Sequence, residues 1–176
     1  GWNGVFAWQA NNVTVENSTI VNNGGGTVGT TMPDRISGIR YQQVTSGTIN
    51  NNYIGTDAAK TLAGNNFDGI TLHTNASNVQ VTNNVITNNG LNSVYGAGGG
   101  LAIREASNGN LVRSNFIGVH RDSTAGRNND YGISIESSSN NIIGGDNANQ
   151  GNWIAGAGRG VWVSFAGSQN NQIFRN

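Results

Sequence analysis

The sequence contains no cysteine, one proline and one methionine, and only 10% of its 176 residues are charged. Without cysteine, the chain has no disulfide framework, no thiolate zinc site and no cysteine nucleophile. Nine basic residues balance nine acidic ones, so there is no basic excess to neutralise nucleic-acid phosphates. No apolar run approaches the roughly 18 residues of a membrane-spanning helix. We therefore expect neither nucleic-acid binding nor membrane insertion.

Glycine and asparagine are abundant instead, with 27 glycines and 31 asparagines in the chain. Both are poor helix formers, which argues against a helical bundle. Such a composition alone is typical of disordered segments. The apolar residues, however, are placed at regular intervals, and this regularity predicts a folded repeat protein.

A short motif of glycine followed by alternating apolar residues occurs six times. The copies are GVFAW at Gly4, GIRYQ at Gly38, GITLH at Gly69, GLAIR at Gly100, GISIE at Gly132 and GVWVS at Gly160. The intervals between these glycines are 34, 31, 31, 32 and 28 residues. A second element follows each copy by about ten residues, and its core is an apolar residue followed by Asn-x-Ile. The period predicts three short strands in each repeat.

Three strands joined by turns close one coil of a parallel solenoid. One coil cannot bury its apolar face, but stacked coils share a continuous core. Alternation places pairs such as Ile39/Tyr41, Ile70/Leu72 and Leu101/Ile103 inside this core. We expect residues 1–176 to form one β-solenoid domain of about six coils, which is either a segment of a longer solenoid or a stacking subunit.

Asparagine recurs at one position of the second element. The column contains Asn52, Asn84, Asn115, Asn152 and Asn176, with Ser18 in the first copy. Asparagine tolerates left-handed turn conformations, and stacked amides can bond to one another. We interpret this column as a structural asparagine ladder.

The sequence resembles the right-handed parallel β-helix repeats of the pectate-lyase-like superfamily, of the secreted bacterial type. The resemblance is carried by NYIGTDAAKTLAGN (52–65), SNNIIGG with GNWIAG (139–156) and NFIGVHRDSTAGRNNDYGISI (115–135). It implies an all-β fold, a single-stranded right-handed parallel β-helix with three short strands per coil. It implies little about activity, because this scaffold carries lyases, epimerases, adhesins and structural proteins.

The outward positions of the first strand are candidate sites for chemistry. One column places His73, Arg104 and Glu136 on consecutive coils, about 4.8 Å apart. Enzymes that resemble this fold bind polysaccharide beside one strand face, where such residues could abstract a proton next to a uronate carboxylate. The alternative is an Arg104–Glu136 ion pair with His73 as an exposed neighbour.

Several family patterns for catalysis are missing from the sequence. There is no pair of adjacent aspartates as in the pectin-hydrolysing members, and no aspartate cluster of the calcium-dependent lyases. A lone carboxylate per loop, Asp57 or Asp122, is a poor cation site. We expect no cofactor and no metal, calcium included, and the sequence favours a non-catalytic role.

The loops after the third strands and the aromatic residues offer two other surfaces. The loops, at 21–37, 55–68, 87–99, 118–131 and 155–159, should leave the solenoid on one side. The repeat pattern runs without a capping helix, and aromatic residues gather in the end copies. These candidate stacking residues are Trp2, Phe6, Trp8, Trp153, Trp162 and Phe174.

These features favour an extracellular structural or assembly solenoid whose open ends stack head-to-tail on other copies, as a filament or surface structure. The signal segment would be absent from this chain. One alternative is a carbohydrate-active lyase or epimerase. Another is a non-catalytic glycan-binding or adhesive module that uses Trp8, Trp162 and the loops on one side.

Overall fold

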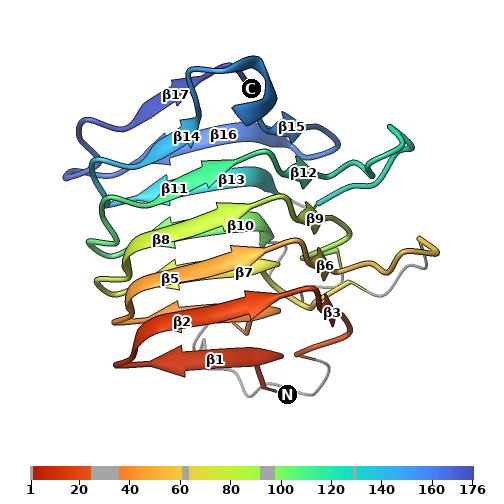
Figure 1. Cartoon of the computed structure of the whole chain (residues 1–176), viewed down its shortest axis with the longest axis horizontal. Helices are drawn as coiled ribbons and strands as arrows, with labels where there is room; N and C mark the ends of the chain where they lie inside the picture. Colours follow the sequence, from red (N-terminus) through yellow and green to blue (C-terminus); the bar gives the residue numbers. More distant parts are fainter. Residues whose placement is uncertain (1, 25–35, 61–63, 92–97, 129) are drawn as a thin grey trace.

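The computed structural model of the chain describes residues 2–24, 36–60, 64–91, 98–128 and 130–176. Its strands form three parallel sheets that wind around one axis, with the two termini at opposite ends of the stack (Figure 1). Helix in the described ranges is limited to one 3-10 turn, η1 (Ala148–Gln150). The predicted all-β parallel solenoid with three strands per coil is confirmed.

The sheets contain six, six and five strands. Sheet A consists of β1 (Val5–Trp8), β4 (Ile39–Gln42), β7 (Ile70–His73), β10 (Gly99–Arg104), β13 (Tyr131–Glu136) and β16 (Arg159–Ser164). Sheet B consists of β2 (Asn11–Glu16), β5 (Thr45–Asn50), β8 (Ser77–Thr82), β11 (Leu111–Arg113), β14 (Ile142–Gly144) and β17 (Gln172–Phe174). Sheet C consists of β3 (Thr19–Ile20), β6 (Tyr53–Ile54), β9 (Val85–Ile86), β12 (Phe116–Ile117) and β15 (Trp153–Ile154).

The core is a set of apolar columns that run through the stack. In sheet A, Ile39 pairs with Ile70, which pairs with Leu101, which pairs with Ile133. All four side chains are fully buried. Each such side chain contributes about 1.5–3 kcal/mol. A few apolar residues per coil are therefore enough to hold the solenoid together, despite its low hydrophobic content.

In the second coil, a large core side chain is accommodated by a glycine on the facing sheet. Tyr41 occupies a core position where the next coil has Leu72, and its ring needs more room. Gly47 stands in sheet B between Val13 and Val79, and a Cβ there would lie 3.0 Å from the Tyr41 ring. The missing side chain thus makes space for the ring. The Tyr41 hydroxyl donates to the Val13 carbonyl at 3.1 Å.

The corners between strands depend on polar residues in left-handed conformations. At the corner between sheets B and C, φ is 53–58° at Asn17, Asn51, Asn83 and Ser114. The next residue in each coil belongs to the asparagine column. Asn52, Asn84 and Asn115 are buried, and the side-chain oxygen of each accepts bonds from the residue one coil before, at 2.9–3.0 Å.

Two further asparagine ladders and a serine ladder run along other corners. One contains Asn23, Asn65, Asn89 and Asn128. Another contains Asn110, Asn141 and Asn171, beside Ser107, Ser138 and Ser168. The corners leave buried backbone groups without strand partners, and these amides bond to them. This role at the corners explains much of the high asparagine content.

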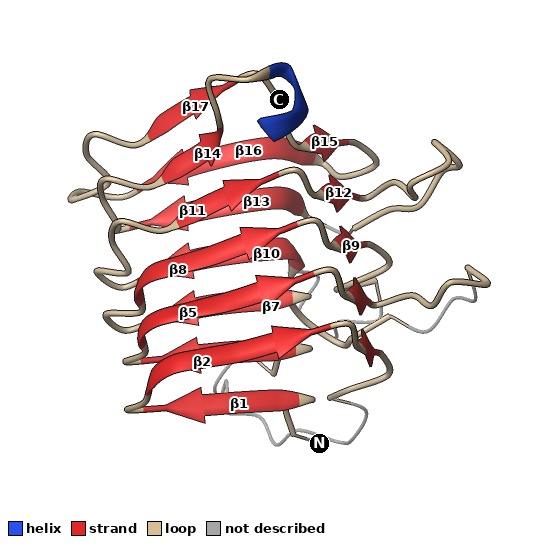
Figure 2. Ribbon diagram, viewed as in Figure 1, coloured by secondary structure: helices blue, strands red, loops and turns tan. Residues whose placement is uncertain are grey.

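The loops after sheet C leave the solenoid on one side, on the right in Figure 2. Those after β6 and β12 project farthest (Figure 1). Parts of the predicted loop segments, at 25–35, 61–63, 92–97 and 129, lie outside the described residues. Residues 55–60 and 118–128 are described throughout and carry the site treated next.

Candidate ligand-binding site

The outer face of sheet A holds the predicted catalytic column, and Arg104 lies at its centre. Arg104 is 4% exposed, and each of its three nitrogens donates to a protein group. Nε donates to Glu136 at 3.0 Å, Nη1 to Asp68 at 2.8 Å and Nη2 to the Tyr131 hydroxyl at 2.5 Å. Burial opposes the charge, but the Asp68, Tyr131 and Glu136 groups outweigh it and hold the pKa of Arg104 above its ordinary value. This guanidinium is fully engaged inside the fold.

Asp68 is the partner that the spacing of the sequence does not reveal. It is 0% exposed and comes from the loop before β7 rather than from a strand position. Its carboxylate accepts bonds from the Thr71 hydroxyl at 2.9 Å, from the Gly99 amide at 3.0 Å and from Tyr131. The outer face of the middle coils is thus a buried polar network, whereas the sequence suggests an open groove.

His73 lies beside this network but turns toward another partner. Its Nε2 is 3.3 Å from Glu105, and its Nδ1 is 2.5 Å from the Thr74 hydroxyl. Glu136 accepts a bond from Ser134 at 3.0 Å as well as the one from Arg104. Arg104 and Glu136 thus form the ion pair of the structural alternative, whereas His73 is half-buried and paired with Glu105 rather than an exposed neighbour.

The aromatic residues of the end coils are spread over several surfaces. Trp2 is 88% exposed, and Phe6 and Trp8 are also exposed in the first coil. Trp162 packs against Tyr131 and lies under Arg159, 4.6 Å from the guanidinium carbon to the ring centroid. The half-buried Phe174 lies on β17, next to β14.

Trp153 belongs to a different feature, an aromatic row on the outer face of sheet C. Each strand of this sheet has two residues, of which the isoleucine points inward. The register Tyr53–Val85–Phe116–Trp153 sets the outer residues of successive coils side by side. The Phe116 and Trp153 rings lie 6.1 Å apart. The alternation before each isoleucine is visible in the sequence, but sequence analysis did not identify this row.

Two loops flank the row, and each begins at a glycine with a special conformation. Gly55 has φ 79° and Gly118 has φ 74°. A Cβ at either position would run into a backbone carbonyl of the next coil, that of Thr87 or of Ala155. Only glycine fits such a position without strain. Both loops are therefore directed outward from the same corner of the solenoid.

The loop after β12 is a small hairpin. Val119 and Ala125 form an antiparallel bridge, and the His120 amide donates to the Thr124 carbonyl at 3.0 Å. At its tip, the Asp122 carboxylate accepts bonds from the Thr124 amide at 3.2 Å and hydroxyl at 2.7 Å. These local bonds give the loop a defined shape.

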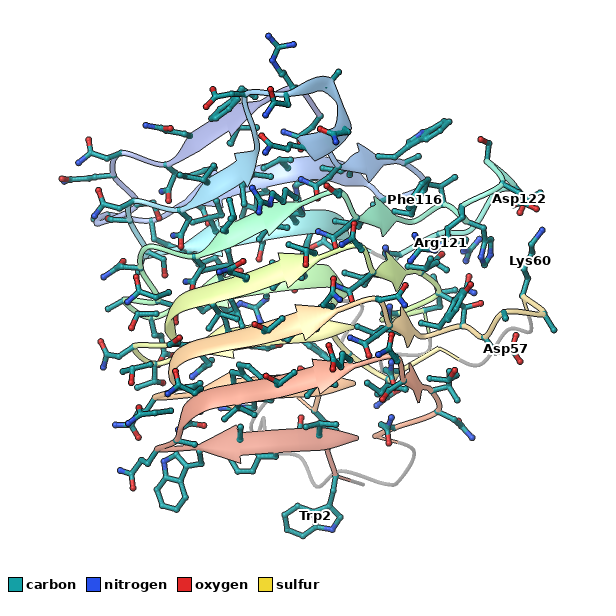
Figure 3. All side chains as sticks on the ribbon, in the orientation of Figure 1. Trp2, Asp57, Lys60, Phe116, Arg121 and Asp122 are labelled. Atoms are coloured by element: carbon teal, nitrogen blue, oxygen red, sulfur yellow. The ribbon has the colours of Figure 1, made fainter. Side chains whose placement is uncertain are left out.

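The hairpin contacts two earlier coils. Asp122 forms an ion pair with Lys60 of the loop after β6 (Figure 3). Hydrogen bonds from Lys60 and Thr124 hold the pKa of Asp122 well below its usual range. Arg121 lies over the Phe116 ring, 5.6 Å from the centroid, and donates to Asn51 at 3.1 Å and to the Asn83 carbonyl. We call this pairing of the two loops through Lys60 and Asp122 the clasp.

A pocket of about 170 Å³ lies between the clasped loops. It is lined by Tyr53, Asp57, Ala58, Lys60, His120, Arg121 and Asp122. His120 is only 6% exposed, and burial together with the positive charge of Lys60 lowers its pKa. At the opposite end of the row, Trp153 lines a larger hollow of about 480 Å³ together with residues of the last coil. The two hollows lie at opposite ends of the row, but Val85 in its middle is fully buried and Arg121 lies over Phe116, so the row is not exposed along its whole length.

Comparison with known proteins identifies the fold family. A family model described as "Right handed beta helix region" matches residues 3–176. No curated protein and no solved structure matches the chain at a significant level. Within the described ranges, no three His, Asp or Glu side chains come together to hold a metal ion. Nor do those ranges contain a helix long and apolar enough to cross a membrane.

Proposed function

Because the chain belongs to the right-handed β-helix family, we propose that it is a non-catalytic glycan-binding module that displays its binding surface on the outer face of sheet C. The observation that carries this proposal is the pair of Phe116 and Trp153 rings on the outer face of sheet C, which lies between the hollow at Trp153 and the clasped loops.

The row has the composition that a sugar chain needs. Ligand sites combine aromatic surface with a few placed polar groups, and a sugar ring offers both an apolar face and hydroxyl edges. Phe116 and Trp153 supply aromatic surface, and the stacked guanidinium of Arg121 supplies donors beside it. The Phe116 and Trp153 rings lie on neighbouring coils, about 4.8 Å apart, and together with the hollow at Trp153 they form a surface that suits an oligomer better than a small metabolite.

The state of the sheet A face supports binding without turnover. Arg104 and Glu136 are committed to each other, and Asp68 is buried beneath them. A general base has to reach its proton in a substrate, and these groups are arranged to stabilise the fold. An extracellular or cell-surface location is part of the proposal.

Replacing Trp153 with alanine tests the proposal. Trp153→Ala should weaken retardation in gels that contain soluble polysaccharide by about tenfold, because it removes the main exposed ring of the row. Trp2→Ala is the matched control, since Trp2 is more exposed but lies far from the row (Figure 3). The wild-type chain should release no sugar fragments during the experiment.

Three results would contradict the proposal. They are a wild-type chain that no neutral or acidic polysaccharide retards, an equal loss in both tryptophan variants, and the release of cleaved products. The last result would restore the enzymatic alternative and make Arg104 and Glu136 the next residues to replace.

End-to-end assembly is a second candidate function, favoured by the apolar surface of the end coils. Trp2, Phe6 and Trp8 are exposed in the first coil, and Val163, Phe165 and Ile173 in the last. Exposed strand edges with such residues are surfaces on which other strands can pair. Head-to-tail contact between copies would cover them.

The ladders give this second candidate less support than the apolar surface does. The strand register shows which residues of the first coil correspond to the ladder residues of the last. Val13 takes the position of Asn171, and Ala10 takes the position of Ser168. Of the three columns that reach the last coil, at Ser168, Asn171 and Asn176, a copy stacked in register would continue only the one that begins at Ser18. The corner between sheets A and B would lose its bonding pattern, so glycan binding is the function we place first.

A further inference from the structure

His120 is an unusual residue for a loop tip. It is 6% exposed, yet among the described residues its ring nitrogens have no hydrogen-bond partner, and it lines the pocket between the clasped loops. Its ring nitrogens are not fully enclosed, so they can bond to solvent or to a ligand in the pocket. The hairpin around it is held by its own backbone bonds, so the imidazole is not needed to shape the loop.

The charges around His120 balance. Lys60 and Arg121 are positive, Asp57 and Asp122 are negative, and all four line the pocket. Burial and Lys60 lower the pKa of His120 from its ordinary value of 6.5, so the ring is neutral near pH 7. A pocket without net charge gives an anionic or cationic ligand no electrostatic advantage.

The hydrogen-bonding groups of the pocket suit hydroxyl groups. Neutral imidazole has one donor and one acceptor, and the Tyr53 hydroxyl is also both. Each sugar hydroxyl can donate and accept in the same way. The volume of about 170 Å³ suits one ring rather than a chain. The clasp between Lys60 and Asp122 closes this end of the row, whereas the other end is the open hollow at Trp153.

We propose that the pocket binds the terminal unit of an uncharged sugar chain, with His120 as the residue that recognises its hydroxyl groups. This inference rests on the proposed glycan-binding function. It adds the position of the chain end, a preference for neutral over acidic sugars and the residue responsible. The remainder of the chain passes over the Arg121 guanidinium, which lies on Phe116, toward Trp153.

The chain is suited to a direct test because it contains only two histidines, His73 and His120. With ¹³C-labelled histidine, NMR spectra of the intact protein show one set of ring signals for each. We would titrate methyl glycosides of glucose, galactose and mannose, and the methyl glycosides of glucuronate and galacturonate. At least one neutral glycoside should shift the His120 signals saturably and leave the His73 signals in place. The matching uronate should bind about fivefold or more weakly.

Two variants separate recognition from folding. His120→Phe removes both ring nitrogens and should weaken glycoside binding by about tenfold or more. His120→Gln keeps a donor and an acceptor and should retain a larger part of the affinity. His73→Gln is the matched control and should bind like the wild type. Thermal unfolding of each variant checks that the loops remain folded.

The pH dependence provides an independent readout. Binding should weaken as the pH falls below 6.5 and His120 takes up a proton, because the imidazolium has lost its acceptor. The charged groups that face His120 are Asp57, Lys60, Arg121 and Asp122, and the pKa of Asp122 is lowered well below this range by its hydrogen bonds from Lys60 and Thr124. His120→Gln should abolish this dependence.

The inference is overturned if no neutral glycoside moves the His120 signals, if uronates bind as tightly, or if His73→Gln has the same effect as His120→Phe. Its failure is distinguishable from failure of the proposed function. Polymer retardation that depends on Trp153 with silent His120 signals leaves glycan binding in place and removes the terminal site. Glycoside binding at His120 without polymer retardation would leave the terminal site in place and remove the proposed binding of polymers along sheet C.

Discussion

At the scale of single residues, the asparagines of the ladders supply hydrogen bonds to backbone groups at the corners, as the neighbouring strand does inside a sheet. Asn84 illustrates this. Its side-chain oxygen accepts two bonds from Asn52, and its side-chain nitrogen donates to the Ile49 carbonyl at 2.8 Å and to Asn115 at 3.0 Å. The residue is fully buried. The asparagine amide combines this short reach with two donors and an acceptor.

Asn84→Ala should therefore destabilise the protein by about 3 kcal/mol, because several buried partners lose their bonds at once. Asn176→Ala is the matched change in the last coil of the same column, where solvent can replace the lost partners, and it should cost about 1 kcal/mol. Urea unfolding measures both. Equal costs in the two variants would contradict a role for the ladder in satisfying buried groups.

At the scale of elements, the face of sheet A is held by the side chains of three coils and one loop. Arg104 and Glu136 lie on neighbouring strands, but Asp68 joins them from the segment before β7. A buried carboxylate is stable only when it is paired and hydrogen-bonded. The middle coils therefore depend on a network that crosses from loop to sheet.

Arg104→Leu should destabilise the protein by about 3–5 kcal/mol, because it leaves the carboxylate of Asp68 buried without its counter-charge. Arg113→Leu, at a half-exposed position on β11, should change the stability by less than about 0.5 kcal/mol. The double variant Asp68→Leu/Arg104→Leu should recover part of the loss. If Arg104→Leu left thermal unfolding unchanged, the network would have no structural role.

The regularity of the strands explains why so much of the architecture can be predicted from the sequence. Apolar alternation after Gly38, Gly69 and Gly100 sets both the register and the inward side chains. The side-chain pairings made by loop residues do not follow from this pattern. Asp68 and Arg104 are 36 residues apart, and Lys60 and Asp122 are 62 apart, with nothing in the spacing to connect them. Pairings of this kind depend on loop paths, so the polar network and the clasp could not be predicted.

At the scale of the whole molecule, the stack ends in coils that differ from each other. The last coil has the ladder residues Ser168, Asn171 and Asn176, whereas the first has Ala10, Val13 and Ser18 at these positions. The stability of such an array is the sum of the coils and their contacts with neighbours. We therefore expect contact between two copies to be weaker than contact between two inner coils.

We accordingly expect the chain to sediment as a species of 18.4 kDa. The double variant Ala10→Ser/Val13→Asn supplies the missing side-chain oxygens and should increase self-association, because the ladders that end at Ser168, Asn171 and Asn176 could then all continue into a second copy. Sedimentation velocity over a range of concentrations measures both. Filaments of the wild-type chain that Trp2→Ala disperses would instead support end-to-end assembly as the function.

The direction of the hydrogen bonds between coils has a mechanical consequence. They run along the axis that joins the two termini (Figure 1), so tension between the ends acts on them lengthwise and opens one coil before the next. Each detached coil of about 31 residues releases roughly 100 Å of chain. A solenoid anchored at one end would therefore lengthen in steps under shear, and its remaining coils would stay wound and keep presenting their loops.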